Sequence, residues 1–187
     1  MVAAFAALSM NAQNDMYVGG SLGFSTTSYD GNNMGNTFKI LPEVGMKLDE
    51  NWGIGVVVGY SNTKRTKEAT GTVDLNSNAF TIAPYVRYTA FTFGNVNIFA
   101  DGIFQYVSGN DESAKAGSAV DNKYNTWGLA IQPGVAYNIS DSFSLVAKFG
   151  SLVGYSSYKP DGGEATNTFS LLDLKTTGLS FGFYYNF

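Results

Sequence analysis

The feature that most constrains this chain is an alternation of side chains with a period of two. From residue 16 onward, large aliphatic or aromatic residues recur at every second position, with glycine, serine or charged residues between them. In residues 52–60 the large members are Trp52, Ile54, Val56, Val58 and Tyr60. Successive side chains of a strand point to opposite faces, so this period predicts β-strands. No run of 18 apolar residues occurs, so no transmembrane helix is predicted.

The alternation predicts eight strands joined by connections of two lengths. The strands are expected at 16–27, 37–48, 52–63, 79–91, 95–108, 124–139, 143–158 and in a last strand ending at Phe187. Tight turns are expected at 49–51, 92–94 and 140–142, longer polar loops near 64–76, 109–123 and 159–167, and a shorter loop near 28–36. Short turns on one rim and long loops on the other are typical of outer-membrane barrels. We therefore predict an all-β fold, an eight-stranded antiparallel up-and-down transmembrane β-barrel, over residues 14–187.

The charged residues of the strands indicate which face of the barrel is outside. Those on the face opposite the large apolar set are Lys39, Glu43, Lys47, Arg87, Asp101 and Lys148. A soluble barrel would have an exterior of small residues with few charges, which gives poor solubility. Its eight strands would also enclose more aromatic bulk than such a barrel holds. The apolar face is therefore expected to contact lipid, and a soluble, lipocalin-like ligand-binding barrel is the alternative.

Aromatic residues gather at the two ends of the predicted apolar band. Amphipathic rings favour the membrane–water interface, so these residues are predicted to form girdles. The predicted girdle residues are Trp52, Tyr60, Tyr106, Trp127, Tyr137, Phe143 and Tyr155.

Three similar segments begin with a proline in the middle of a predicted strand. They start at Pro42, Pro84 and Pro133, and each has valine two positions later. A repeat of about one hairpin indicates similar hairpins that close on themselves. Proline removes a donor from the strand ladder, so bulges or skewed pairing are expected at these positions.

Residues 1–13 have the composition of a targeting segment. An apolar stretch ends in small residues, as in the hydrophobic region and cleavage end of a secretory signal. We expect a partial signal peptide cleaved near Ala12, and export of the chain through the periplasm.

The C-terminal strand carries the most specific resemblance to a known family. Its alternating aromatic residues are Phe181, Phe183, Tyr185 and Phe187. With the proline repeats, this strand resembles small bacterial outer-membrane barrels of the OmpA transmembrane-domain and OmpX type, and the outer-membrane barrels of the Bacteroidetes. The resemblance implies a place in the bacterial outer membrane, contact with its lipid and lipopolysaccharide, and recognition of the last strand by the barrel-assembly machinery.

Four of the inward charges form the candidate site. Glu43, Arg87, Asp101 and Lys148 lie at similar distances from the short turns, so they are expected to share one layer of the lumen. Grouped charges can pair through charge-assisted hydrogen bonds, whereas an isolated buried charge is costly. We predict a network that fills the lumen, and a proton or ion path is the alternative.

Composition excludes most other functions. The chain has no histidine and no cysteine, which removes the usual general base, thiolate nucleophile and metal ligands. Its net charge of −4 provides no basic surface for nucleic acid. We therefore predict no enzyme, no cofactor and no metal. The predicted function is a monomeric structural or surface-interaction barrel whose loops are available to an extracellular partner, and the alternative is a porin-like transporter of small solutes or hydrophobic compounds.

Overall fold

The computed structural model describes residues 16–29, 32–68, 72–115, 118–173 and 179–187, so the predicted signal segment 1–13 lies outside the described residues. Within these ranges, no helix is long and apolar enough to cross a membrane. The strands are β1 (Met16–Tyr29), β2 (Asn32–Lys47), β3 (Trp52–Glu68), β4 (Thr72–Phe93), β5 (Val96–Lys115), β6 (Ser118–Asn138), β7 (Phe143–Lys148), β8 (Ser151–Pro160), β9 (Thr166–Asp173) and β10 (Ser180–Asn186).

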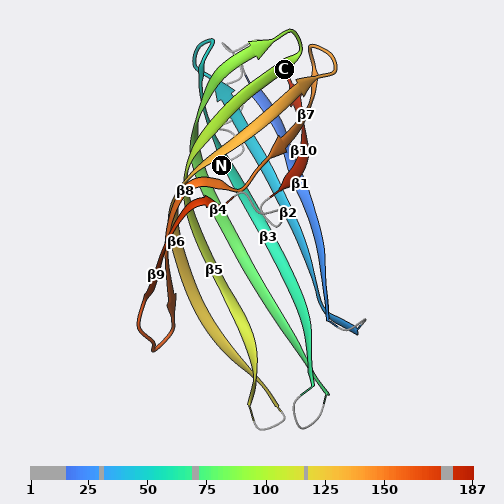
Figure 1. The fold of residues 1–187 in the computed structure, drawn as a ribbon, viewed down its shortest axis with the longest axis vertical. Helices are drawn as coiled ribbons and strands as arrows, with labels where there is room; N and C mark the ends of the chain where they lie inside the picture. Colours follow the sequence, from blue (N-terminus) through green and yellow to red (C-terminus); the bar gives the residue numbers. More distant parts are fainter. Residues whose placement is uncertain (1–15, 30–31, 69–71, 116–117, 174–178) are drawn as a thin grey trace, which may run out of the picture.

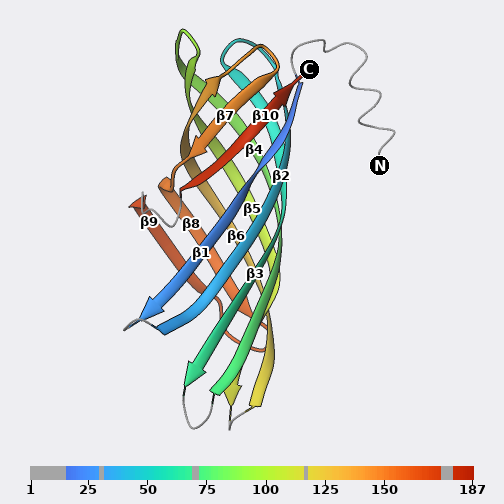
Figure 2. The ribbon, with the colours of Figure 1, turned by 90° about the vertical axis from the view of Figure 1, so that its right-hand side faces the viewer.

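The strand segments close into a barrel at the end that carries the short turns. Each of β1 to β6 pairs antiparallel with the next strand in sequence, β8 pairs with β6, and β10 pairs with both β7 and β1 (Figures 1 and 2). The predicted strand 143–158 is interrupted at Phe149 and Gly150, giving β7 and β8, while β9 and β10 together occupy the eighth position. The prediction of an eight-stranded antiparallel barrel is confirmed.

The turns at this end match the sequence prediction. Strands β2 and β3, β4 and β5, and β6 and β7 are each joined by a few residues. In the first turn, the backbone amides of Asn51 and Trp52 donate to Asp49 Oδ1 at 2.8 and 2.7 Å. In the second, Gly94 has a φ of 56°, which glycine adopts without steric cost. Asp and Gly therefore set these turns through their usual local chemistry.

At the opposite end, the prediction of long loops was largely wrong. The segments 28–36, 64–76 and 109–123 are mostly strand, because only residues 69–71 separate β3 from β4 and only 116–117 separate β5 from β6. The apolar alternation stops there, but backbone pairing does not need it and continues between polar residues. Figure 1 shows that the hairpins β3–β4 and β5–β6 extend farthest from the closed end. The connection between β8 and β9, at 161–165, agrees with the prediction.

Each repeated proline interrupts the ladder with the strand that follows. In the ladder between β2 and β3, the regular pairing skips Leu41 and Pro42, and in the ladder between β4 and β5 it skips Ala83 and Pro84. Opposite Pro133 the partner strand itself breaks between β7 and β8, and the Phe149 amide donates to the Pro133 carbonyl at 2.9 Å. The predicted irregular pairing is confirmed, and its cause is the missing proline N–H.

Apolar side chains cover the outside of this barrel and polar ones lie within it. Phe24, Leu22 and Phe181 are 73%, 64% and 64% exposed, whereas Asp101 is fully buried. The buried apolar cluster inside the barrel consists of Tyr17, Tyr85, Phe99, Ala136, Val146 and Tyr184. The predicted orientation of the two faces is the one observed.

The inward aromatic rings lie across glycines of neighbouring strands. Tyr17 is paired with Gly45 and Tyr85 with Gly55, and a Cβ on either glycine would lie 2.3 Å from the tyrosine opposite. The same relation holds for Phe99 with Gly134 and for Tyr184 with Gly19. The glycines on the inward face therefore leave the space that lets large rings lie flat within a narrow lumen.

Candidate functional site: a charged network inside the barrel

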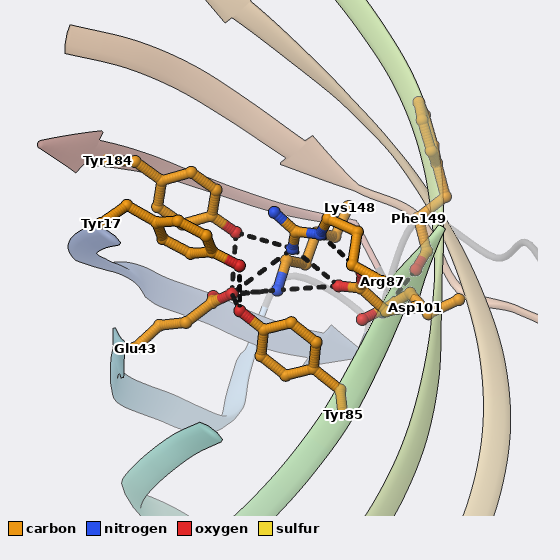
Figure 3. A network of polar contacts seen from close by, with 9 residues as sticks. Tyr17, Glu43, Tyr85, Arg87, Asp101, Lys148, Phe149 and Tyr184 are labelled. Atoms are coloured by element: carbon orange, nitrogen blue, oxygen red, sulfur yellow. Dashed lines mark hydrogen bonds and ion pairs between the residues drawn. The ribbon is translucent and has the colours of Figure 1, made fainter. Parts of the chain in front are cut away.

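Four strands contribute one charge each to a single layer of the lumen. Glu43 comes from β2, Arg87 from β4, Asp101 from β5 and Lys148 from β7. Arg87 and Asp101 are direct cross-strand partners. The alternation of the strands directs all four side chains inward, and the structure brings them into mutual contact (Figure 3).

The contacts pair each cation with both carboxylates. Arg87 donates from Nε to Asp101 Oδ1 at 2.7 Å and from Nη2 to Asp101 Oδ2 at 2.8 Å, which is a bidentate ion pair. Lys148 Nζ donates to Glu43 Oε2 at 2.8 Å and lies 3.3 Å from Asp101 Oδ2. Arg87 Nη2 is also 3.4 Å from Glu43 Oε1. Two positive and two negative groups therefore form a network without net charge.

Three tyrosines complete the network, and sequence reasoning did not include them. Tyr85 and Tyr184 donate their hydroxyls to Glu43 Oε1 at 2.6 and 2.8 Å. Tyr184 also accepts a hydrogen bond from Arg87 at 3.0 Å, and the Tyr17 and Tyr85 hydroxyls bond to each other. The signal that identifies them was available, because all three lie on the strand face opposite the large apolar residues, which is the face that also carries the charges.

The network is enclosed by rings and excluded from solvent. The Arg87 guanidinium lies 3.9 Å from the centroid of the Phe99 ring, a cation–π contact. The exposed fractions are 0% for Asp101, 6% for Glu43, 8% for Arg87 and 9% for Lys148. Buried charges with this many partners are strongly held, because removing one leaves another uncompensated.

The remaining predicted inward charges lie elsewhere. Lys39 and Lys47 are exposed, and neither contacts the network. Among the described residues, no group of histidine, cysteine, aspartate and glutamate side chains could hold a metal ion. The site can therefore fix the walls of the barrel to one another, and every ionic group in it has a partner.

The predicted girdle residues lie on the outside. Trp52, Tyr60, Tyr106, Trp127, Tyr137 and Phe143 are exposed, and Tyr155 is half-buried. Several form aromatic pairs with neighbours, as Trp127 does with Tyr155 at 5.4 Å between ring centroids. Tyr106 donates its hydroxyl to Asn125 at 2.8 Å. In the last strand, Phe181, Phe183 and Tyr185 point outward in β10, and the Phe187 amide donates to the Met16 carbonyl at 3.0 Å.

Comparison with solved structures shows the fold. The chain is similar to Neisserial surface protein A (16% identity, TM-score 0.53, covering 92% of this chain and 97% of that one). It is similar to OprG from Pseudomonas aeruginosa, with 13% sequence identity and a TM-score of 0.56, and the match covers 94% of this chain and 97% of that one. It is also similar to Ail of Yersinia pestis, solved in complex with the heparin analogue sucrose octasulfate. That match has 13% sequence identity and a TM-score of 0.50, and it covers 94% of this chain and 99% of that one. No curated protein matches the chain. The family model described as "Outer membrane protein beta-barrel domain" matches residues 1–187.

Proposed function

The chain belongs to the outer membrane protein β-barrel domain family and lies in the bacterial outer membrane, and from this premise we propose that it is a structural and surface-interaction barrel. Its lumen is closed by its own side chains, and it acts as a monomer. The soluble, lipocalin-like alternative is set aside, because the family and the apolar exterior both require a membrane.

The observation that carries this proposal is the full burial of Asp101 between Arg87 and Lys148. A solute crossing this layer would have to break the bidentate pair and leave charges unpaired in a poorly solvated interior. The rings of Tyr17, Tyr85 and Phe99 occupy the space beside these charges. The network therefore seals the barrel and ties together strands that are far apart in sequence.

The surface available to partners is formed by the strand extensions. The β3–β4 and β5–β6 hairpins project beyond the others and carry polar and charged residues such as Arg65, Asp111 and Lys123. Ail, which shares this fold, has been solved in complex with a heparin analogue. We propose that the projecting hairpins of this chain contact an extracellular partner.

Contacts within the membrane belong to the same proposal. The aromatic girdles anchor the barrel at the two interfaces, next to outer-membrane lipid and lipopolysaccharide. The alternating aromatic residues from Phe181 to Phe187 provide the signal for the barrel-assembly machinery. We assign no catalysis, because the chain contains neither histidine nor cysteine.

Liposome swelling tests the closed lumen. The refolded protein is incorporated into liposomes, which are diluted into a graded series of sugars, with an open porin as the positive control. The proposal expects swelling no faster than in protein-free liposomes. Swelling rates that decrease with solute size would identify a transporter instead.

One observation favours transport as a second candidate. Among the residues that the structure describes, β1 pairs with β10 from Tyr17 to Leu22, and the one partner of β9 is β8. Within the described residues, no pairing joins β9 to the rest of β1, and we propose a lateral opening of the wall in this region, on the loop side of the network. A hydrophobic compound could enter there, and the liposome experiment includes an uptake assay with a hydrophobic fluorescent probe to detect it.

A further inference from the structure

The outer wall formed by β4, β5 and β6 carries two hollows outside the charged network. The hollow nearer the turns has a volume of about 550 Å³, and its outward lining residues are Pro84, Val86, Phe104, Leu129, Ile131 and Val153. The hollow nearer the loop end has a volume of about 510 Å³, and its lining includes Tyr60, Asn78, Phe80, Asn110, Lys123 and Asn125. Both volumes lie in the range of small-molecule sites.

The strand register places the two hollows on one stripe of the exterior. We call the hollow nearer the loop end the upper hollow and the hollow nearer the turns the lower hollow. In the upper hollow, Asn78 is opposite Asn110, and Asn110 is opposite Lys123. In the lower hollow, Val86 is opposite Gly102, and Gly102 is opposite Ile131. All these side chains share the outward parity. From Phe80 to Val86, β4 advances about 20 Å at the usual rise per residue.

The lower hollow exists because an outward position has no side chain. Gly102 is exposed, and a Cβ built on it would meet only the Val86 carbonyl oxygen, at 3.8 Å. The neighbouring Val86, Phe104 and Ile131 are 46%, 44% and 45% exposed and form apolar walls. A depression of this kind at the depth of the bilayer fits a hydrocarbon chain.

The upper hollow combines side chains of a different character. Asn110 donates to Asp121 Oδ1 at 3.0 Å, and Asn125 accepts from Tyr106, so these groups are held in place beside the Phe80 ring. Amides and carboxylates exchange hydrogen bonds with hydroxyl groups, while an aromatic face packs against apolar C–H surface. The charged residues of the lining are Asp121, Lys123 and Asp161, whose sum of −1 disfavours an anion.

We propose that this stripe binds a glycolipid of the outer leaflet. Its uncharged sugar head occupies the upper hollow, and one acyl chain runs past Tyr106 and Trp127 into the lower hollow. The stripe lies on the exterior, so the proposal does not depend on whether the lumen is closed. It assigns to the β4–β6 wall a specific lipid ligand in addition to the general lipid contact of a barrel.

The test is native mass spectrometry of the protein released from nanodiscs. The discs contain equal amounts of glucosyl-diacylglycerol, phosphatidylglycerol and diacylglycerol with identical acyl chains. The proposal expects preferential retention of the glucosyl lipid by the unmutated protein. Equal retention of the three lipids, or preference for phosphatidylglycerol, would overturn it.

Two variants examine the two hollows separately. Asn110→Ala is expected to reduce retention of the glucosyl lipid about fivefold, the effect of one net hydrogen bond, without changing retention of diacylglycerol. Gly102→Leu fills the lower hollow and is expected to reduce retention of all three lipids. Val18→Leu, on the exposed face of β1, is the matched control and should change nothing. Heat-modifiable gel migration verifies folding, and unchanged retention by folded Gly102→Leu would contradict the proposal.

Discussion

The two ends of the barrel contain the same kind of ion pair in opposite surroundings. At the network, the Arg87 and Asp101 side chains are 10% and 0% exposed. On the strand extensions, Arg65 contacts Asp111, and these side chains are 46% and 40% exposed. An exposed pair is screened by water and salt and contributes little, whereas a buried pair cannot lose one member without leaving an unpaired charge. We therefore expect the closed half to depend on its interior charges and the extensions to depend mainly on backbone pairing.

The largest expected effect is that of Arg87→Leu. It leaves Asp101 and Glu43 with Lys148 as the sole remaining cation, and breaking a buried pair in this way costs about 3–5 kcal/mol. The measurement is the free energy of unfolding by urea in lipid vesicles. Arg65→Leu is the matched control on the extension. Equal effects of the two variants would break the comparison between the two ends, and we expect no wide pore in either.

A charge introduced on the outer surface of the closed half tests whether that surface contacts lipid. Val56 pairs with Val44 and Pro84 at the outward parity. Arginine at a lipid-facing position near the midplane costs about 2–4 kcal/mol, so Val56→Arg should destabilise the folded barrel by that amount. Refolding experiments with Val56→Leu provide the reference. A variant as stable as its parent would show that this face does not contact hydrocarbon.

The packing of the inward aromatic rings beside the network should give a smaller effect on stability. Gly45→Val would place atoms where the Tyr17 ring lies and is expected to cost about 1–3 kcal/mol, the usual range for overpacking. Gly102→Ala is the matched control, because the space outside Gly102 is open. Urea unfolding of both variants sharpens the comparison, and a neutral Gly45→Val would mean that the ring is not fixed.

The smallest effect is expected on the extensions. Asp111→Asn removes the charge that contacts Arg65 and should cost about 0–1 kcal/mol. Because salt screens exposed pairs, this difference should shrink further at high ionic strength. A cost as large as that of Arg87→Leu would mean that the extension is stabilised in the same way as the network.

The sequence predicted the closed half better than the extensions, for a physical reason. In the closed half, one face of each strand contacts lipid and the other faces the lumen. The alternation of apolar and polar residues therefore indicates both that the segment is a strand and which side chains point inward, so the inward directions of Glu43 and Lys148 could be predicted. Tyr184 follows from the same rule, but the predicted site was chosen from charged residues alone and so did not include it. On the extensions both faces are polar, so pairing continues without an alternating signal and segments such as 109–123 resemble loops.

The break between β7 and β8 could not be predicted from the sequence of residues 143–158 alone. Residues 143–158 alternate without a proline, yet the strand is interrupted at Phe149 and Gly150. The proline responsible lies across the sheet at Pro133, and Gln132 donates its side-chain amide to the Phe149 carbonyl at 2.6 Å. Such an interruption depends on which strands are neighbours, which the tertiary fold decides.

Single-channel recording in planar bilayers tests the central claim most directly. If two cations, two carboxylates and the surrounding rings close the axis of the barrel, the unmutated protein should insert without producing a wide and stable conductance. A steady, large conductance from that same folded protein would contradict the closed lumen.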